Sequence, residues 1–257
     1  MAQHPTAIID PGAVIDPSVE IGPYAVIGNH VHIGAGSRIG AHCVIEGPTR
    51  IGVNNQIHAH AAVGGAPQDK KYAGEPTWLE IGNANTIREF VTINRGTTHG
   101  GGTTRIGDDN WIMAYVHIAH DCVIGNHTIL ANSVTLAGHV IVHDHAILGG
   151  FSLIHQFCKI GAHAFTGMGS KINCDVPPYV VVGSDMSVPR SINSEGLKRR
   201  GYSTEQITAI KRAYKTLYLS GLSLKEAREK LIAQAVNSPD VMLLVDFIDQ
   251  SERSILR

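Results

Sequence analysis

The polar residues that carry the clearest chemistry share one spacing. His120, Gly138 and Gln156 lie eighteen residues apart, and each follows a bulky aliphatic residue by two positions. An imidazole with an ordinary pKa of ~6.5 can accept a proton at neutral pH. A glycine leaves its backbone amide unshielded, so that the amide can stabilise an oxyanion. A fold that stacks these positions would place a base, an amide donor and a neutral polar side chain in one line.

The neighbours of this set are polar as well: His117, Asp121, His139 and His155. The chain contains no nucleophile elbow, P-loop or dinucleotide fingerprint, because its many glycines follow a different pattern. A direct group transfer that uses a base and an oxyanion hole needs no enzyme nucleophile. The set therefore indicates transfer chemistry, with a row of solvated polar residues as the alternative.

A second histidine column has the same spacing. His127, His145 and His163 are also eighteen residues apart, and imidazole is a common zinc ligand. Stacked residues on successive coils of a β-structure lie ~4.8 Å apart whatever their type, however. We therefore favour a structural column and expect no metal site.

The elements that would position these residues follow from a strict period of six. Bulky aliphatic residues recur in one register: Ile9, Ile15, Ile21, Ile27, Ile33, Ile39, Ile45, Ile51, Ile57 and Val63. The period resumes at Ile81 and, after a slip of one residue, runs from Ile106 to about Ile172. Helices repeat every 3.6 residues and strands every two, so this period predicts a parallel β-helix with one hexad per side. Glycine often follows the aliphatic residue, and we expect it to supply the positive φ of a tight corner.

Two segments interrupt the hexads, near 64–79 and near 96–104, and both are rich in glycine, proline or threonine. Loops on a minimal solenoid often carry function. After Val188 the period changes, and capping signals predict helices that begin after Ser203, Ser223 and Ser238, with a short helix over 192–200. We predict a β-helix over residues 1–187 and a helical C-terminal domain over 188–257.

Composition narrows the classes of function. The formal net charge is −1, so no overall field favours nucleic acid. Cys43, Cys122 and Cys158 fall at the small inward position of the hexad, which favours core filling in a reducing cytosol. The chain shows neither a signal peptide nor an apolar run of ~18 residues. We expect a soluble, cytoplasmic protein without an integral membrane segment.

Six motifs, taken together, resemble those of the UDP-N-acetylglucosamine 3-O-acyltransferases of lipid A biosynthesis. They are QDKKYAGEP (68–76), HIAHDC (117–122), LAGHV (136–140), HQFC (155–158), DVPPYV (175–180) and EGLKRRG (195–201). The resemblance covers essentially the whole chain. It implies a left-handed β-helix that forms a homotrimer with active sites between subunits, and the first step of lipid A biosynthesis. In that step a 3-hydroxyacyl chain passes from acyl carrier protein to the 3-hydroxyl of UDP-N-acetylglucosamine (UDP-GlcNAc).

The resemblance also implies roles for single residues. His120 would be the general base, Asp121 would orient or polarise it, and the Gly138 amide would hold the oxyanion. The implied substrate-binding residues are Asp69, Lys71, His117, His139, His155, Gln156, Asn193, Glu195, Arg199 and Arg200. No bound cofactor is implied, because 4′-phosphopantetheine arrives on the carrier protein. The basic residues Lys211, Arg212 and Lys215 are spaced to share a helix face that would receive this acidic carrier.

Two positions depart from the common family pattern. Asn94 stands where the family commonly has histidine, and an amide can form hydrogen bonds but does not titrate. Met168 stands at the position that limits acyl length, where glycine accompanies a long chain. A bulky side chain should block the distal acyl groove, so we expect a shorter donor such as 3-hydroxydecanoyl.

Three other interpretations of the function remain open at this point. One is a different hexapeptide acyltransferase, although acetyl-CoA-dependent members lack the loop at 68–76. Another is a metal-dependent solenoid similar to γ-class carbonic anhydrases, with the His127 column as its candidate site. A third is a structural solenoid without catalytic activity.

Overall fold

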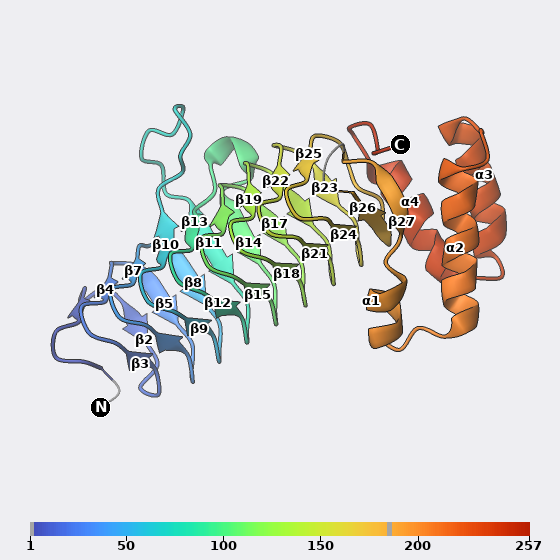
Figure 1. Cartoon of the computed structure of the whole chain (residues 1–257). Coiled ribbons are helices and arrows are strands. Elements are labelled where there is room, and N and C mark those ends of the chain that lie inside the picture. Colours follow the sequence, from blue (N-terminus) through green and yellow to red (C-terminus); the bar gives the residue numbers. More distant parts are fainter. Residues whose placement is uncertain (1–2, 184–186) are drawn as a thin grey trace.

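A computed structural model describes residues 3–183 and 187–257 of the chain. Most of the chain winds into a prism with three parallel sheets as its sides, and the helices lie at one end (Figure 1). Each coil contributes one short strand to every sheet, and each strand pairs with the strand of the next coil. The fold is therefore the parallel β-helix of hexapeptide repeats that the period of six predicts, followed by an α-helical domain.

The nine-stranded sheet contains β1 (Ile8–Ile9), β4 (Val26–Ile27), β7 (Val44–Ile45), β10 (Ala62–Gly65), β13 (Thr92–Asn94), β16 (His117–Ile118), β19 (Thr135–Leu136), β22 (Leu153–Ile154) and β25 (Lys171–Ile172). The eight-stranded sheet contains β2 (Val14–Ile15), β5 (Val31–Ile33), β8 (Thr49–Ile51), β11 (Trp78–Ile81), β14 (Thr103–Ile106), β17 (Val123–Ile124), β20 (Ile141–Val142) and β23 (Lys159–Ile160).

The ten-stranded sheet contains β3 (Glu20–Ile21), β6 (Arg38–Ile39), β9 (Gln56–Ile57), β12 (Thr86–Ile87), β15 (Trp111–Ile112), β18 (Ile129–Leu130), β21 (Ile147–Leu148), β24 (Phe165–Thr166), β26 (Val180–Val182) and β27 (Pro189–Ile192). All pairs in the three sheets are parallel except β26 with β27, which is antiparallel. The division into domains at residues 187 and 188 stays a prediction.

The inward aliphatic residues form one continuous core. Ile45, Ile87 and Ile112 are fully buried, and the small inward positions, such as Ala25 and Cys43, fill the space between them. Burial raises the pKa of Cys122 to about 12 and that of Cys158 to about 11. These thiols are core residues, as predicted, and not nucleophiles.

The corners differ from the sequence-based expectation. The residue with positive φ is the third after the inward aliphatic residue, and it is usually not glycine; His42, Phe90 and Asp121 have φ values of 58°, 58° and 60°. The glycine directly after the aliphatic residue is needed for another reason. A Cβ on Gly40 would lie 2.6 Å from the backbone nitrogen of Ala59 on the next coil. Close stacking of coils therefore explains most of these glycines, whereas Gly64, with φ 82°, has the positive φ that the sequence predicts.

Three columns of such corner residues run along the prism, and we name each after one member. The Phe90 corner contains Tyr24, His42, His60, Phe90 and Tyr115; the Asp121 corner contains Asp121, His139 and Phe157; the His127 corner contains Asp109, His127, His145 and His163. Rings within the Phe90 corner stack with centroids 4.9–5.1 Å apart. Such contacts offset part of the cost of left-handed backbone at non-glycine residues.

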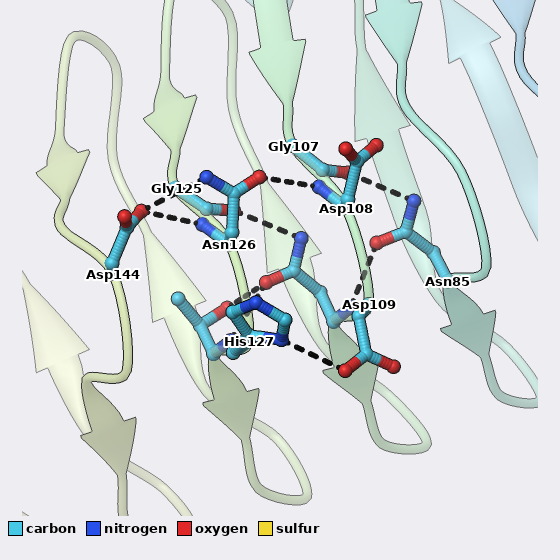
Figure 2. A network of polar contacts seen from close by, with 10 residues as sticks. Asn85, Gly107, Asp108, Asp109, Gly125, Asn126, His127 and Asp144 are labelled. Carbon is cyan, nitrogen blue, oxygen red and sulfur yellow. Dashed lines mark hydrogen bonds and ion pairs between the residues drawn. The ribbon is translucent and has the colours of Figure 1, made fainter.

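Two polar ladders stabilise the prism next to the His127 corner (Figure 2). Inside, the Oδ1 of Asn85 accepts a hydrogen bond from the backbone of Asn110 at 2.9 Å, and Oδ1 of Asn110 accepts one from Thr128 at 2.8 Å. Outside, Oδ1 of Asn126 accepts a hydrogen bond from the backbone nitrogen of Asp108, and the backbone nitrogen of Asn126 donates one to Oδ1 of Asp144. Each buried amide is thereby satisfied by the next coil.

The C-terminal helices begin largely where capping signals place them. They are α1 (Ser194–Arg199), α2 (Thr204–Tyr218), α3 (Leu224–Ala235) and α4 (Met242–Gln250). Capping boxes at Ser203 and Ser223 are both formed. Ser238 makes no side-chain cap, and a 3-10 turn, η2 (Pro239–Val241), precedes α4 there. None of the helices in the described ranges combines the length and apolar character that crossing a membrane requires.

The core predicts a clear contrast between two isoleucine-to-alanine variants. Ile33 is almost fully buried, whereas Ile8 is 66% exposed. We expect Ile33→Ala to lower the free energy of unfolding by ~2–5 kcal/mol because it leaves a cavity. Ile8→Ala should change it by less than about 1 kcal/mol. Denaturant unfolding of both variants measures the difference, and equal losses would contradict this assignment of the core.

Candidate active site at the Asp121 corner

The candidate site begins with two adjacent residues where β16 turns into β17. The Nδ1 atom of His120 lies 2.8 Å from Oδ2 of Asp121. The Asp121 side chain is fully buried, and that of His120 is 14% exposed. Because a carboxylate only accepts, Nδ1 carries the proton and Nε2 keeps a free lone pair. Nε2 has no hydrogen-bond partner within the described chain.

Asp121 is held by the second loop, between β13 and β14. The backbone amide of Thr97 donates to Oδ1 at 2.8 Å, and the Thr97 hydroxyl donates to Oδ2 at 2.6 Å. A Cβ on Gly100 would lie 2.1 Å from Cγ of Asp121, so this loop closes over the carboxylate. These donors stabilise a buried charge that would otherwise be costly. The sequence analysis did not predict a role for Thr97. The only indication was that Thr97 lies in the threonine-rich segment that interrupts the hexads.

Gly138 lies directly beside His120 on the next coil. The backbone nitrogen of His139 donates to the carbonyl of His120 at 3.1 Å, which fixes the two coils in register. A Cβ on Gly138 would lie 2.6 Å from Cε1 and 2.8 Å from Nε2 of His120. The absence of a side chain therefore lets the ring lie against this backbone. The Gly138 amide has no acceptor among the described residues, and it is free for a ligand oxygen.

The column continues to Gln156. The backbone nitrogen of Phe157 donates to the Gly138 carbonyl at 3.2 Å, so Gln156 lies one coil beyond Gly138. The spacing of eighteen thus brings His120, Gly138 and Gln156 into one row, as the sequence indicates. Gln156 itself is exposed.

Two more histidines border the His120–Asp121 pair. His117 shares a hydrogen bond of 2.7 Å between its Nδ1 and the Thr92 hydroxyl. Desolvation lowers the pKa of His117, and repulsion from His120 lowers it further. Desolvation also lowers the pKa of His139, although the charge of Asp121 opposes this. Both rings are therefore neutral at pH 7 and can offer hydrogen bonds to a polar ligand.

The first loop, between β10 and β11, adds Asp69 and Lys71. The backbone amide of Lys71 donates to Oδ1 of Asp69 at 2.9 Å and is the main cause of the lowered pKa of Asp69. A protonated His120 would lower the pKa of Asp69 as well, which places this carboxylate within electrostatic reach of the site. In the view of Figure 1 this loop stands out from the β-helix beside the second loop.

The C-terminal tail supplies a residue that sequence reasoning missed. Arg253 contacts Nδ1 of His155 at 3.1 Å and donates to the carbonyl of Gln156. The tail is fixed by the buried Asp175, whose Oδ2 accepts from the Ser251 hydroxyl at 2.6 Å. Nothing in the hexad period indicates where a tail after four helices returns, so the sequence carried no usable signal.

An open groove of about 310 Å³ runs over the nine-stranded sheet beside this column. Its lining includes Thr135, Ala137, Leu153, His155, Lys171 and Asn173. Met168 lies between β24 and β25, just before the chain enters the nine-stranded sheet, and its side chain is 72% exposed. His120 follows β16 of the same sheet, so the residue expected to limit chain length and His120 border one sheet at opposite edges.

Four predicted binding residues are not beside His120 in one chain: Asn193, Glu195, Arg199 and Arg200. The Nδ2 atom of Asn193 donates to the carbonyl of His163 at 3.1 Å. Arg200 donates to the carbonyl of His145 at 2.9 Å, so this segment lies on the His127 corner. The ion pair of Glu195 with Lys198, at 2.8 Å, is the first cause of the lowered pKa of Glu195.

Metal ligation can be judged from the same geometry. His120, Asp121 and His139 form the one group within the described ranges whose ligand atoms lie close enough to share an ion. However, Asp121 already accepts hydrogen bonds from Thr97 and His120. The rings of His127 and His145 stack face to face at 4.9 Å, so their nitrogen atoms do not converge.

Comparison with known proteins identifies the class and then the family. The family described as "Bacterial transferase hexapeptide (six repeats)" matches residues 103–138, so the repeat is that of the hexapeptide-repeat transferases, and the match includes His120, Asp121 and Gly138. The family described as "Udp N-acetylglucosamine O-acyltransferase; Domain 2" matches residues 175–256.

Relatives extend this match to the full length. The acyl-[acyl-carrier-protein]–UDP-N-acetylglucosamine O-acyltransferase of Xanthomonas campestris pv. campestris (strain B100) is 60% identical over 255 residues, which are 99% of this chain and 97% of that protein. Its counterpart in Halorhodospira halophila is 60% identical over 254 residues, 99% and 98% of the two chains. The solved structure of the UDP-N-acetylglucosamine O-acyltransferase from Moraxella catarrhalis has a TM-score of 0.98 and 44% identity, with both chains covered completely. The chain belongs to the UDP-N-acetylglucosamine O-acyltransferase family.

The contact between His120 and Gly138 predicts the effect of one methyl group. In Gly138→Ala, the new Cβ needs the space of the His120 ring, and we expect the ring to leave Asp121. Because the clash is with the end of a side chain, the fold should survive. A crystal structure of the variant, or the imidazole NMR signals of His120, would show the displacement. Gly150→Ala is the matched control, since its Cβ would meet only the Asn132 carbonyl at 3.2 Å; an unmoved His120 ring would contradict this geometry.

Proposed function

We propose that this protein transfers a 3-hydroxyacyl chain from acyl carrier protein to the 3-hydroxyl of UDP-GlcNAc, the first step of lipid A biosynthesis. The names of full-length relatives at 60% identity support the reaction. The observation that carries the mechanism is the free Nε2 of His120, which lies beside the side-chain position of Gly138, a residue whose amide has no acceptor among the described residues. The donor brings its own 4′-phosphopantetheine arm, and we place the reaction in the cytoplasm.

In the proposed mechanism, Nε2 of His120 takes the proton of the sugar 3-hydroxyl as its oxygen attacks the thioester carbonyl. The Gly138 amide donates a hydrogen bond to the oxyanion that forms. Collapse of this intermediate breaks the carbon–sulfur bond, and the thiol of the carrier arm leaves with the proton from His120. Asp121 holds Nδ1–H in place and stabilises the transient imidazolium.

The separation of binding residues over two corners supports a homotrimer. Within one chain, Arg200 lies on the His127 corner and His120 on the Asp121 corner. If neighbouring prisms pack side by side, α1 of one subunit reaches the His120 corner of the next. Asn193, Glu195, Arg199 and Arg200 would then complete a site that each chain holds only in part. Light scattering of the purified protein should give three times the chain mass of 27.5 kDa.

The exposed face of α2 supports docking of the donor. Lys211, Arg212 and Lys215 are exposed, whereas Ile210 and Leu217 on the opposite side are buried. Carrier proteins of this kind are acidic, so a basic face favours their encounter. We propose that this face receives the carrier protein while its arm enters the groove on the nine-stranded sheet.

A metal-dependent hydratase at the same corner is the competing function, since His120, Asp121 and His139 lie close together. The geometry favours the acyltransferase, because the Thr97 hydroxyl and His120 already occupy the Asp121 oxygen that would face an ion. Metal analysis of the purified protein separates the two functions.

His120→Ala tests the general base. We expect kcat for 3-hydroxyacyl transfer to UDP-GlcNAc to fall roughly 10²–10⁴-fold, the usual contribution of such a base. The thermal unfolding curve should remain that of a folded protein. His32→Ala is the matched control, because His32 is an exposed histidine on β5, outside both corners that the proposed site uses. Near-normal turnover by His120→Ala, or loss of turnover with a chelator, would refute the mechanism.

Met168→Gly tests the proposed preference for a medium-length donor such as 3-hydroxydecanoyl. Kinetics with a panel of 3-hydroxyacyl carrier proteins should show that the variant gains activity with longer chains, because the groove is no longer blocked. Met168→Leu keeps the bulk of the side chain and should keep the original preference. If the activity of Met168→Gly depends on acyl length as that of the wild type does, Met168 does not limit the length of the acyl chain.

A further inference from the structure

We propose that residues 94–97 form a joint that fixes the first loop relative to the His120–Asp121 pair, with Arg95 and Tyr72 as its positioning residues. The first loop here means residues 66–77, and it carries Asp69 and Lys71. The inference rests on the proposed function and on the substrate-binding role that the family resemblance implies for these two residues. It adds two residues that no step of the mechanism uses directly.

Arg95 is a buried cation at the base of the first loop. Its side chain is only 9% exposed, although arginine is seldom buried without a partner. Its guanidinium donates to the carbonyl of Gly64 and lies 4.0 Å from a carboxylate oxygen of Glu46. The backbone nitrogen of Arg95 also donates to the Gly65 carbonyl, at 3.0 Å. One residue thus fixes the point where the loop leaves β10.

Tyr72 connects Arg95 to Glu75, near the C-terminal end of the first loop. Nη2 of Arg95 lies 3.4 Å from the Tyr72 hydroxyl, which donates to the carbonyl of Glu75 at 2.9 Å. The backbone nitrogen of Tyr72 donates to the Asp69 carbonyl at 3.0 Å and closes the turn that holds Asp69. Arg95, Tyr72 and this turn therefore form a continuous chain of contacts.

The residues on either side of Arg95 complete the joint. Nδ2 of Asn94 donates to the carbonyl of Ala66 at 2.9 Å, a contact that does not depend on pH because an amide does not titrate. The backbone nitrogen of Gly96 donates to the Trp78 carbonyl at 3.1 Å, where the first loop returns to the β-helix.

Thr97 connects the joint to the catalytic pair. It donates twice to the Asp121 carboxylate, from its backbone amide and its hydroxyl. Four consecutive residues therefore bind both ends of the first loop and the residue that orients His120. Such a short rigid link sets the distance between the Asp69 turn and His120 before any substrate binds. Binding then does not have to order the first loop, and less conformational entropy is lost.

Tyr72→Phe tests the joint with the loss of one oxygen atom. Lys70 and Lys71 are exposed, so trypsin can cut the loop there when it opens. We expect cleavage after these lysines, identified by mass spectrometry, to be roughly 2–10-fold faster, because the variant loses the hydrogen bond to Glu75 and the longer contact with Arg95. KM for UDP-GlcNAc should rise about 2–10-fold while kcat changes much less, because fewer loops are ready to bind. Tyr115→Phe, in an exposed tyrosine on the Phe90 corner, should match the wild type in both assays.

Arg95→Lys provides a second variant, because lysine keeps the charge next to Glu46 but cannot reach several acceptors at once. It should show the same selective cleavage and the same rise in KM. Unchanged cleavage in both variants, or faster cleavage with unchanged KM, would overturn the proposal. Equal acceleration at Lys225 would also overturn it, since the whole fold would then be loosened. If the wild type itself shows no transfer to UDP-GlcNAc, the proposed function fails, while the cleavage comparison still decides whether the joint exists.

Discussion

Everything in this protein depends on the backbone hydrogen bonds between consecutive coils. A strand of only two residues has no stability of its own, so each strand persists because it pairs with the coil before and the coil after. The spacing between paired strands is ~4.8 Å, and every corner residue therefore lies at this distance from its equivalents on both sides. The stacking leaves so little room that a Cβ on Gly40 or Gly107 would collide with the next coil. The same closeness places the His120 ring against Gly138.

The Asp121 corner uses this constraint to bury a carboxyl group beside an imidazole. Asp121 has the left-handed backbone that most corner residues share, and it buries a carboxylate where His139 and Phe157 carry rings on the next coils. Three donors converge on its carboxylate: the amide and hydroxyl of Thr97, which the second loop supplies, and Nδ1 of His120. The Asp121 backbone amide in turn donates to the Thr104 hydroxyl. The site is thus an ordinary corner of the prism, modified by one insertion.

The repeat and the column of His120, Gly138 and Gln156 could be predicted from the sequence because both follow from a fixed period. The capping boxes at Ser203 and Ser223 were equally readable, since a cap is set by residues three apart. Thr97 and Arg253 could not be found in this way. Their partners, Asp121 and His155, are distant in the sequence, and the loop and tail that carry them have no periodicity. The role of glycine was misjudged because the sequence shows where glycine occurs but not which neighbouring backbone approaches it.

The return of the C-terminal tail has a consequence for how the helices and the β-helix are coupled. Asp175 pairs with Ile255 and binds the Ser251 hydroxyl, and this contact brings Arg253 onto the wall that contains His155 and Gln156. Asp175 precedes β26 in the chain and the tail follows α4, so the helical segment is anchored to the β-helix at both of its ends. A loosening of the helices therefore reaches the Gln156 wall through the tail, without any break in the pairing between coils.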